Sequence, residues 1–191
     1  DGKWMAIRSD DLPILDAKTA KEVHRIPSRQ WPKSLAFSPD GKALAYAGDQ
    51  VTCVQPGTWG ELGALAGSGD TKLLAYSPDG RRLATAIGEV VKLWDLASGK
   101  EERVFPGTSG FSLAYSPDGK TILFELLGDL YSIPITGGEA KTITQGLAFE
   151  SQPRFSPDGK SIAFVSDRDG SENVWIVNVD GSDARPLTSG K

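Results

Sequence analysis

Very few side chains in this sequence could perform nucleophilic chemistry. The chain holds one histidine, His24, and one cysteine, Cys53. A serine nucleophile needs a histidine base and an orienting carboxylate, so any such site would have to include His24. Serines near glycines occur at 67–69 and 107–110, but neither stretch reads Gly-x-Ser-x-Gly, the elbow that presents a catalytic serine. We therefore expect no catalytic residues and interpret His24 as a partly exposed strand residue.

The acidic stretch from Asp167 to Asn173 is the one cluster that invites a metal-binding interpretation. Its glycine falls fourth, whereas a calcium loop needs glycine at the sixth position, and the other ligand positions are not filled. We interpret it as an extended hairpin turn, with a weak cation site or a partner contact as the alternative. A single cysteine excludes a disulfide within the chain and a zinc site of several thiolates. The sequence predicts no metal and no cofactor.

Large aromatic residues provide the stronger case for a binding surface. Trp4, Trp94 and Trp175 fall inside predicted strands, where we expect them to pack in the core. Trp31 lies in a connection, and Phe149 takes the matching place in the last part of the chain. Aromatic residues and arginine are enriched at protein contacts, although Trp31 could also cover its own sheet. The candidate binding residues are Trp31, Phe149, Arg168, Asp169, Arg29 and Gln152.

A repeated tetrapeptide, Ser-Pro-Asp-Gly, divides the chain into units. It occurs at 38–41, 77–80, 116–119 and 156–159, so its aspartates are spaced by 39, 39 and 40 residues. A period of this size marks a repeat architecture. Proline presets φ, aspartate bonds the neighbouring backbone and glycine accepts positive φ, which together predict a tight turn. The predicted structural turn residues are Asp40, Gly41, Asp79, Gly80, Asp118, Gly119, Asp158 and Gly159.

Four short runs of strand-forming residues accompany each turn. The predicted strands of the third unit are Lys72–Tyr76, Arg82–Ile87, Val90–Leu96 and Glu101–Phe105. Their connections are as short as antiparallel hairpins require, and no stretch combines a helical period with capping signals. Second strands such as Ala43–Ala47 are apolar on both faces, which is typical of a sheet covered on both sides. The pattern predicts an all-β fold, a β-propeller of four-stranded antiparallel blades.

The repeat predicts about five blades in one propeller domain that covers residues 1–191. The units are approximately residues 1–30, 31–69, 70–108, 109–147 and 148–191. The first unit supplies a second strand (Trp4–Arg8), a third (Pro13–Asp16) and a fourth (Glu22–Ile26), but its first strand would precede Asp1. We therefore expect a segment of a larger propeller in which one inner strand is missing.

Composition and charge exclude several classes of partner. Twenty-one basic and twenty-five acidic residues leave a formal net charge of −4, and no basic run provides a footprint for nucleic acid. No apolar stretch approaches the ~20 residues of a membrane-spanning helix, and no signal peptide is visible. The expected partner is a protein or a peptide, with no nucleic acid and no membrane insertion.

Two units resemble known repeats. Residues 90–100 resemble the third strand and turn of a WD repeat, with Trp94-Asp95 as the signature dipeptide. Residues 156–170 and 173–188 are similar to the WD-like repeat of the TolB family and of propeller-bearing serine peptidases. The other units carry different dipeptides at the Trp-Asp position, and no Gly-His pair is present. The resemblance is to a degenerate, TolB-like propeller of bacterial type.

This resemblance implies a non-enzymatic scaffold for a protein–protein or peptide interaction. The alternative is the propeller portion of a larger serine peptidase of the prolyl-oligopeptidase type, whose catalytic domain lies outside this chain. A third possibility is a TolB-like component of the cell envelope. The compartment would be periplasmic for a TolB-like protein and cytoplasmic otherwise.

The connections that differ most between units are expected to carry the binding site. In a meander, the second-to-third and fourth-to-first connections lie on the rim opposite to the Ser-Pro-Asp-Gly turns. Variable loops on a repeated scaffold are where such proteins usually carry function. We predict that a partner contacts Trp31 and Phe149 on this rim, with Arg168 as a polar anchor.

Overall fold

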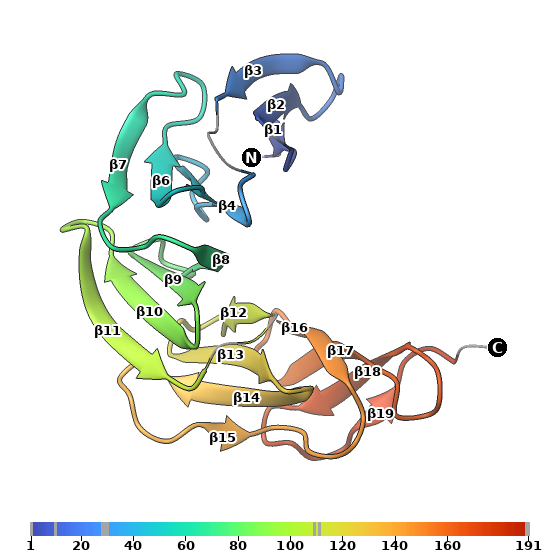
Figure 1. Cartoon of the computed structure of the whole chain (residues 1–191). Coiled ribbons are helices and arrows are strands. Elements are labelled where there is room, and N and C mark those ends of the chain that lie inside the picture. The colour runs from blue at the N-terminus through green and yellow to red at the C-terminus, as the bar shows by residue number, and fades with distance from the viewer. Residues whose placement is uncertain (1, 10, 28–30, 109, 111, 190–191) are drawn as a thin grey trace. The chain divides into compact units, whose positions relative to one another are not determined.

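The computed structural model describes the chain except for residues 1, 10, 28–30, 109, 111 and 190–191. The chain divides into two compact units, Asp1–Val104 and Phe105–Lys191, which are described separately. Within the described residues, all regular elements are β-strands (Figure 1). The single propeller domain over residues 1–191 stays a prediction.

The first unit contains three antiparallel sheets. The first sheet consists of β1 (Trp4–Ala6), β2 (Leu12–Asp16) and β3 (Glu22–Ile26). The second consists of β4 (Leu35–Phe37), β5 (Leu44–Ala47), β6 (Val51–Val54) and β7 (Glu61–Leu65). The third consists of β8 (Thr71–Tyr76), β9 (Arg82–Ile87), β10 (Val90–Asp95) and β11 (Lys100–Pro106). The last two residues of β11 belong to the second unit.

The second unit contains two four-stranded antiparallel sheets. One consists of β12 (Leu113–Tyr115), β13 (Thr121–Leu126), β14 (Asp129–Pro134) and β15 (Lys141–Thr142). The other consists of β16 (Glu150–Phe155), β17 (Ser161–Ser166), β18 (Asn173–Asn178) and β19 (Arg185–Pro186). In all five sheets, neighbouring strands follow one another in chain order, which confirms the predicted meander.

The strand β1 takes the place of a second strand in its sheet. Gly2 has φ +63°, close to the values of the turn glycines in the other units. The Lys3 carbonyl accepts a hydrogen bond from Ala17 N (2.9 Å), as the Arg81 carbonyl does from Leu96 N (3.0 Å). The described part of the first sheet therefore lacks the inner strand, as predicted. β1 is shorter than the predicted Trp4–Arg8. Ile7 N still donates to the Pro13 carbonyl (3.1 Å), but Pro13 has no N–H with which to complete the pair.

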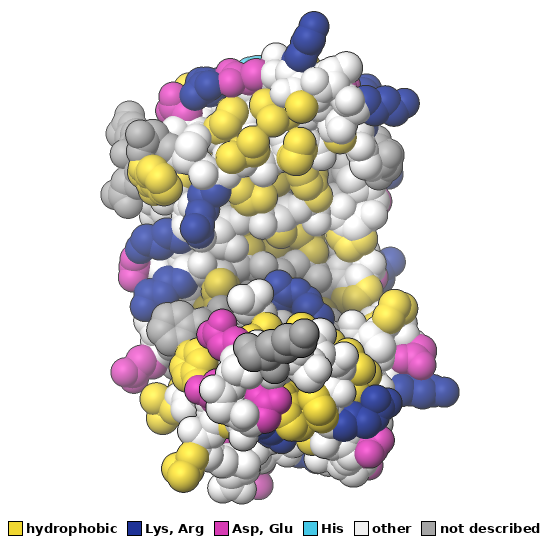
Figure 2. Space-filling model, turned by 90° about the vertical axis from the view of Figure 1, so that its right-hand side faces the viewer, with side chains coloured by type: hydrophobic (Ala, Val, Ile, Leu, Met, Phe, Trp, Pro, Cys, Tyr) yellow, Lys and Arg dark blue, Asp and Glu magenta, His cyan; other side chains and the backbone are white. Residues whose placement is uncertain are grey.

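Hydrophobic side chains fill the space between neighbouring sheets of each unit. In the first unit, one core cluster contains Leu12, Ile14, Ile26, Leu44 and Val54, and another contains Ala45, Ala47, Val51, Leu65, Leu74, Leu83 and Trp94. In the second unit, the cluster contains Leu123, Leu130, Ile143, Ile162, Phe164 and Val177. Each cluster covers the facing sides of two neighbouring sheets, as their apolar strands predict. Other hydrophobic side chains reach the surface, in groups bordered by charged residues (Figure 2).

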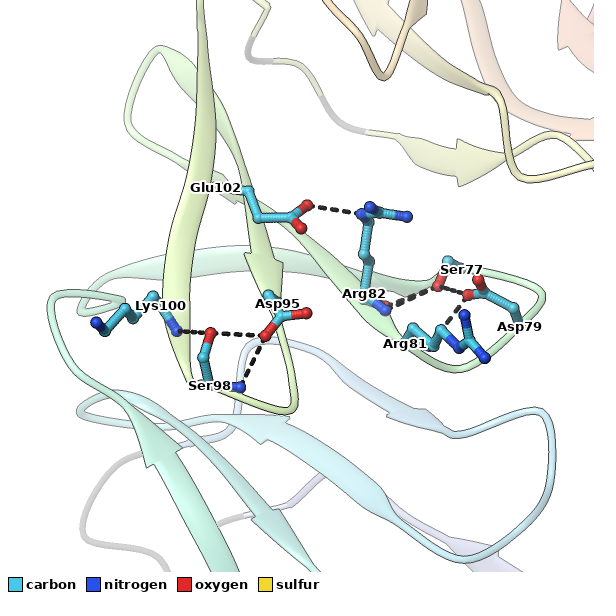
Figure 3. A network of polar contacts seen from close by, with 8 residues as sticks. All are labelled: Ser77, Asp79, Arg81, Arg82, Asp95, Ser98, Lys100 and Glu102. Carbon is cyan, nitrogen blue, oxygen red and sulfur yellow. Dashed lines mark hydrogen bonds and ion pairs between the residues drawn. The ribbon is translucent and has the colours of Figure 1, made fainter.

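The Ser-Pro-Asp-Gly segments join the first strand to the second through the same set of hydrogen bonds. In the third sheet, Ser77 Oγ donates to Asp79 Oδ1 (2.6 Å), and Arg81 N donates to the same oxygen (3.0 Å) (Figure 3). Gly80 N closes the turn on the Ser77 carbonyl (2.9 Å). The turn glycines have φ between +69° and +71°: Gly41, Gly80, Gly119 and Gly159. The tetrapeptide thus satisfies its own polar groups.

A second turn, between the third and fourth strands, is also closed by an aspartate. Asp95 Oδ1 accepts hydrogen bonds from Ser98 N (2.7 Å) and Ser98 Oγ (2.6 Å) (Figure 3). Asp16 binds Thr19 in the same way in the first sheet.

Within the described residues, no helix is long and apolar enough to cross a membrane.

Candidate functional site

The predicted site residues are divided between the two units. Trp31 lies in the first unit, in the connection before β4, with 58% of its surface exposed. Arg29 lies outside the described residues. Phe149, Arg168, Asp169 and Gln152 all belong to the second unit, and the first three lie in connections that meet at one surface.

Three connections of the second unit form this surface, which we call the unit 2 rim. It comprises the β13–β14 turn (Leu127 and Gly128), the β15–β16 connection (residues 143–149) and the β17–β18 connection (residues 167–172). Glu150 N donates to the Gly128 carbonyl (2.9 Å), and Phe149 N donates to Asp167 Oδ1 (2.7 Å). These bonds hold the three connections together across two sheets.

Three large hydrophobic side chains are exposed on the unit 2 rim. Leu127 is 94% exposed, Phe149 is 51% exposed and Leu147 is fully exposed. An ideal Cβ on Gly128 would lie 3.4 Å from the Phe149 ring, so the turn that carries Leu127 lies against Phe149. Sequence reasoning identified Phe149 and missed the two leucines. The available signal was Leu127 itself, because the equivalent position of the β9–β10 turn is occupied by Gly88.

A buried ion pair lies beneath the rim. The Glu150 carboxylate is 2% exposed, and its Oε1 accepts a hydrogen bond from the Arg168 guanidinium. That guanidinium also lies 4.9 Å from the centre of the Trp175 ring, within cation–π range. Burial raises the pKa of Glu150, and the hydrogen bonds with Thr144 and then with Arg168 oppose the rise. Arg168 therefore already has a partner inside the protein, and its role as an anchor for another molecule stays a prediction.

The other two predicted residues, Asp169 and Gln152, make hydrogen bonds within the second unit. Asp169 accepts hydrogen bonds from Asn173 Nδ2 at both carboxylate oxygens (3.1 and 2.9 Å), inside the β17–β18 turn. Gln152 lies in a bulge of β16 with φ +53°, and its backbone N donates to Ser112 Oγ (3.2 Å). The acidic stretch 167–173 is thus a hairpin turn, as interpreted from the sequence. The described residues contain no group of three His, Cys, Asp or Glu side chains that could hold a metal ion.

A shallow depression of about 640 Å³ opens on the unit 2 rim. Its lining residues are Gln145, Gly146, Leu147, Ala148, Asp167, Arg168 and Gly170. It combines an exposed leucine, a carboxylate and a guanidinium, which is a mixture suited to contact with a peptide.

Two further grooves lie beside the Ser-Pro-Asp-Gly turns, and sequence reasoning missed both. The groove in the first unit measures about 420 Å³ and includes Cys53 and Tyr76, whose Sγ and hydroxyl oxygen are 3.9 Å apart. Burial raises the pKa of the Cys53 thiol, so the unreactive thiol form is favoured. The groove in the second unit measures about 490 Å³, with Ser132 and Phe155 in the matching positions. Each groove forms between two sheets, so no local sequence pattern predicts it.

His24 packs against an aromatic ring. Its imidazole stacks on Trp59 at 5.5 Å between ring centres, and Trp59 in turn meets Trp4 edge to face at 5.5 Å. Trp59 joins the core cluster between the first two sheets. This arrangement agrees with the interpretation of His24 as a strand residue.

The chain is similar to a known family of propeller domains and to known proteins. Residues 74–191 match the family PD40, TolB beta propeller domain. The chain is 37% identical over 59 residues to the Tol-Pal system protein TolB of Bordetella pertussis, covering 30% of this chain and 14% of that protein. It is 40% identical over 58 residues to the uncharacterized peptidase YuxL of Bacillus subtilis, covering 30% of this chain and 8% of that protein.

Solved structures show the same fold. The crystal structure of TolB from Acinetobacter baumannii aligns with a TM-score of 0.74 and 22% sequence identity, covering 97% of this chain and 52% of that one. The all-β propeller class predicted from the sequence is therefore confirmed. The chain spans about half the length of this structure and a small part of the curated relatives.

Proposed function

The chain belongs to the PD40 family of TolB beta propeller domains, and from that premise we propose that it is a non-enzymatic scaffold that binds a protein or a peptide. The observation that carries this proposal is the unit 2 rim, where Leu127, Leu147 and Phe149 are exposed together. Large exposed hydrophobic groups bordered by polar residues mark interaction sites. We also propose that the third sheet, which contains Trp94-Asp95, is a WD-like repeat.

The rim also has the rigidity that a binding site needs. Its connections are joined by the Glu150 N–Gly128 carbonyl bond, by the Phe149 N–Asp167 Oδ1 bond and by the buried Glu150–Arg168 pair, so their backbones are held before a partner arrives. Preorganisation of this kind lowers the entropy cost of binding. Trp31 in the first unit is a second proposed contact, supported by its 58% exposure.

A peptide-display selection on the purified chain tests the proposal. Alanine at Phe149 or at Trp31 should weaken selected peptides by roughly 1 kcal/mol or more, which is about fivefold in Kd, as interface anchors do. Lys120→Ala, beside an opposite turn, serves as the control and should leave binding unchanged. Loss of binding in Lys120→Ala, with none in the other two variants, would move the site to the opposite face.

A second candidate function is the propeller portion of a larger serine peptidase, in which this chain would control access to a catalytic domain. The similarity to the peptidase YuxL supports it. Both candidates agree that this chain alone has no turnover, so assays with ester and peptide substrates should give none. Turnover that disappears in His24→Ala would overturn the non-enzymatic assignment. A nucleophile elbow elsewhere in the parent protein would favour the peptidase.

A further inference from the structure

We infer that the unit 2 rim binds a peptide segment in which apolar side chains are accompanied by lysine or arginine. The inference rests on the proposed function and adds the chemistry of the partner. Its two parts, an apolar contact and a negative field around it, come from different observations.

The turn that carries Leu127 lies against Phe149. Leu127 neighbours Gly128, where an added Cβ would lie 3.4 Å from Phe149 Cδ2 and 3.5 Å from the Ala148 carbonyl oxygen. Leu147 and Ala148 then continue the surface into the depression. The three exposed side chains therefore come from adjacent connections of the rim, and together they mark one path along it.

Leu127 has a backbone conformation whose strain a glycine or an asparagine would avoid. It has φ +55° in a two-residue hairpin turn, a conformation that suits glycine or asparagine and penalises a bulky side chain. At 94% exposure it contributes little to the core. The equivalent turn between β9 and β10 contains Gly88 at φ +56°. A leucine here is explained by contact with another molecule.

The charges around this path are almost all negative. The rim and the residues that flank it carry five carboxylates, Asp129, Glu150, Asp167, Asp169 and Glu172, against the single guanidinium of Arg168. Arg168 is already paired with the buried Glu150, so the exposed field comes from the other acids. Complementary charge sets which partner is attracted and in what register. A cationic peptide fits this field, and an anionic one does not.

An acidic partner would also disturb the protein itself. It would have to draw Arg168 away from Glu150 and leave a buried carboxylate without its counter-charge, which is strongly destabilising. A cationic partner can use Asp167, Asp169 and Glu172, which are exposed, without breaking that pair.

Three fluorescent peptides of equal length test the inference against the full 191-residue chain. One alternates leucine or phenylalanine with lysine, and the others replace every lysine by glutamate or by glutamine. Fluorescence anisotropy should give binding for the lysine peptide, at least tenfold weaker binding for the other two, and weakening with added salt. Absence of binding by the lysine peptide overturns the inference.

Two matched variants locate the contact. Leu127→Asn suits the positive φ, so thermal unfolding should show a fold at least as stable as the parent, while the lysine peptide should bind about tenfold more weakly. Val179→Asn removes an exposed apolar side chain beside the groove at the opposite turns and should bind normally. If the parent, Leu127→Asn and Val179→Asn bind the lysine peptide equally well, the site does not lie on the rim.

The same experiment separates this inference from the proposed function. If the glutamate or glutamine peptide binds as tightly as the lysine peptide and also loses affinity in Leu127→Asn, the rim is a peptide site and only the cationic class is wrong. If display-selected peptides show no dependence on Phe149, Trp31 or Leu127, the proposed function fails as well.

Discussion

The Ser–Asp pairs of the Ser-Pro-Asp-Gly turns place a carboxylate among hydrogen-bond donors. Asp118 Oδ1 accepts from Ser116 Oγ (2.7 Å) and from Lys120 N (3.0 Å), and these bonds hold the pKa of Asp118 below its usual value of 3.8. The pKa values of Asp40, Asp79 and Asp158 are lowered by the same kind of serine hydrogen bond. The turns are therefore most stable when these aspartates are ionised.

We predict that the chain loses stability in acid through these turns. A carboxylate with a lowered folded-state pKa stabilises the protein above its unfolded pKa, and this contribution is lost as the pH falls below about 4 through the folded pKa. Denaturant unfolding followed from pH 6 downwards should show the decline. In Ser116→Ala, an NMR titration should give a pKa for Asp118 closer to 3.8. An unchanged pKa would mean that the serine does not bind the carboxylate in solution.

The Glu150–Arg168 pair leads to a second prediction at the residue scale. Arg168→Met should destabilise the chain by about 2–4 kcal/mol at pH 7, because removal of one partner leaves a buried charge. Without Arg168 the folded-state pKa of Glu150 rises further above its usual value of 4.5. The deficit should therefore shrink as the pH falls toward that value and grow as the pH rises.

The double variant Glu150→Gln/Arg168→Met provides the control, since it has no charge at either position of the pair. It should be more stable at pH 7 than Arg168→Met alone and should lose that pH dependence. A deficit in Arg168→Met that stays constant with pH would instead point to lost packing on Trp175 and Phe164.

The turns between strands show how far local sequence determines an element. The glycine of each Ser-Pro-Asp-Gly segment adopts the expected positive φ, because the tetrapeptide closes on itself. Turns between the third and fourth strands are less regular in sequence. Gly99 has φ +65° in the third sheet, whereas the first and second sheets place Ala20 at +54° and Trp59 at +58°. These two conformations are imposed by the sheets and could not be predicted from residue type.

We predict that Gly80→Val destabilises the chain by roughly 1–3 kcal/mol, because valine is strained at φ +69°. Gly60→Val is the matched control: Gly60 does not have positive φ, and an added Cβ would make only an ordinary 3.7 Å contact with Thr58 Oγ1. Denaturant midpoints measure both. If Gly80→Val unfolds at the parent midpoint, the turn does not require glycine.

At the scale of the whole molecule, the repeat allows equivalent residues to be compared. Met5 is 41% exposed, whereas the residues in the same place after the other turns, Leu44, Leu83, Ile122 and Ile162, are fully buried. The neighbouring Ile7 is also exposed. The first sheet therefore presents an apolar face, and β1 has one edge without a paired strand among the described residues.

We predict that this chain self-associates through the first sheet, because apolar faces and open strand edges favour association. Light scattering should show a mass that rises with concentration, and a hydrophobic dye should bind. Met5→Glu together with Ile7→Lys should reduce both effects, whereas Val179→Lys should change them less. A monomer that binds no dye at high concentration would contradict the prediction.

Within this protein, the sequence alone determined the period, the Ser-Pro-Asp-Gly turns, the strand order and the three-stranded first sheet. All of these depend on contacts between residues close in the chain, so turn chemistry and strand pattern suffice. Phe149 could be selected because an aromatic residue in a variable loop is unusual. The rim around it could not, because residues 127, 149 and 167 meet only through hydrogen bonds and packing between two sheets. The burial of Glu150 and its pairing with Arg168 were likewise decided by the tertiary structure, since burial depends on what the rest of the chain places around a residue.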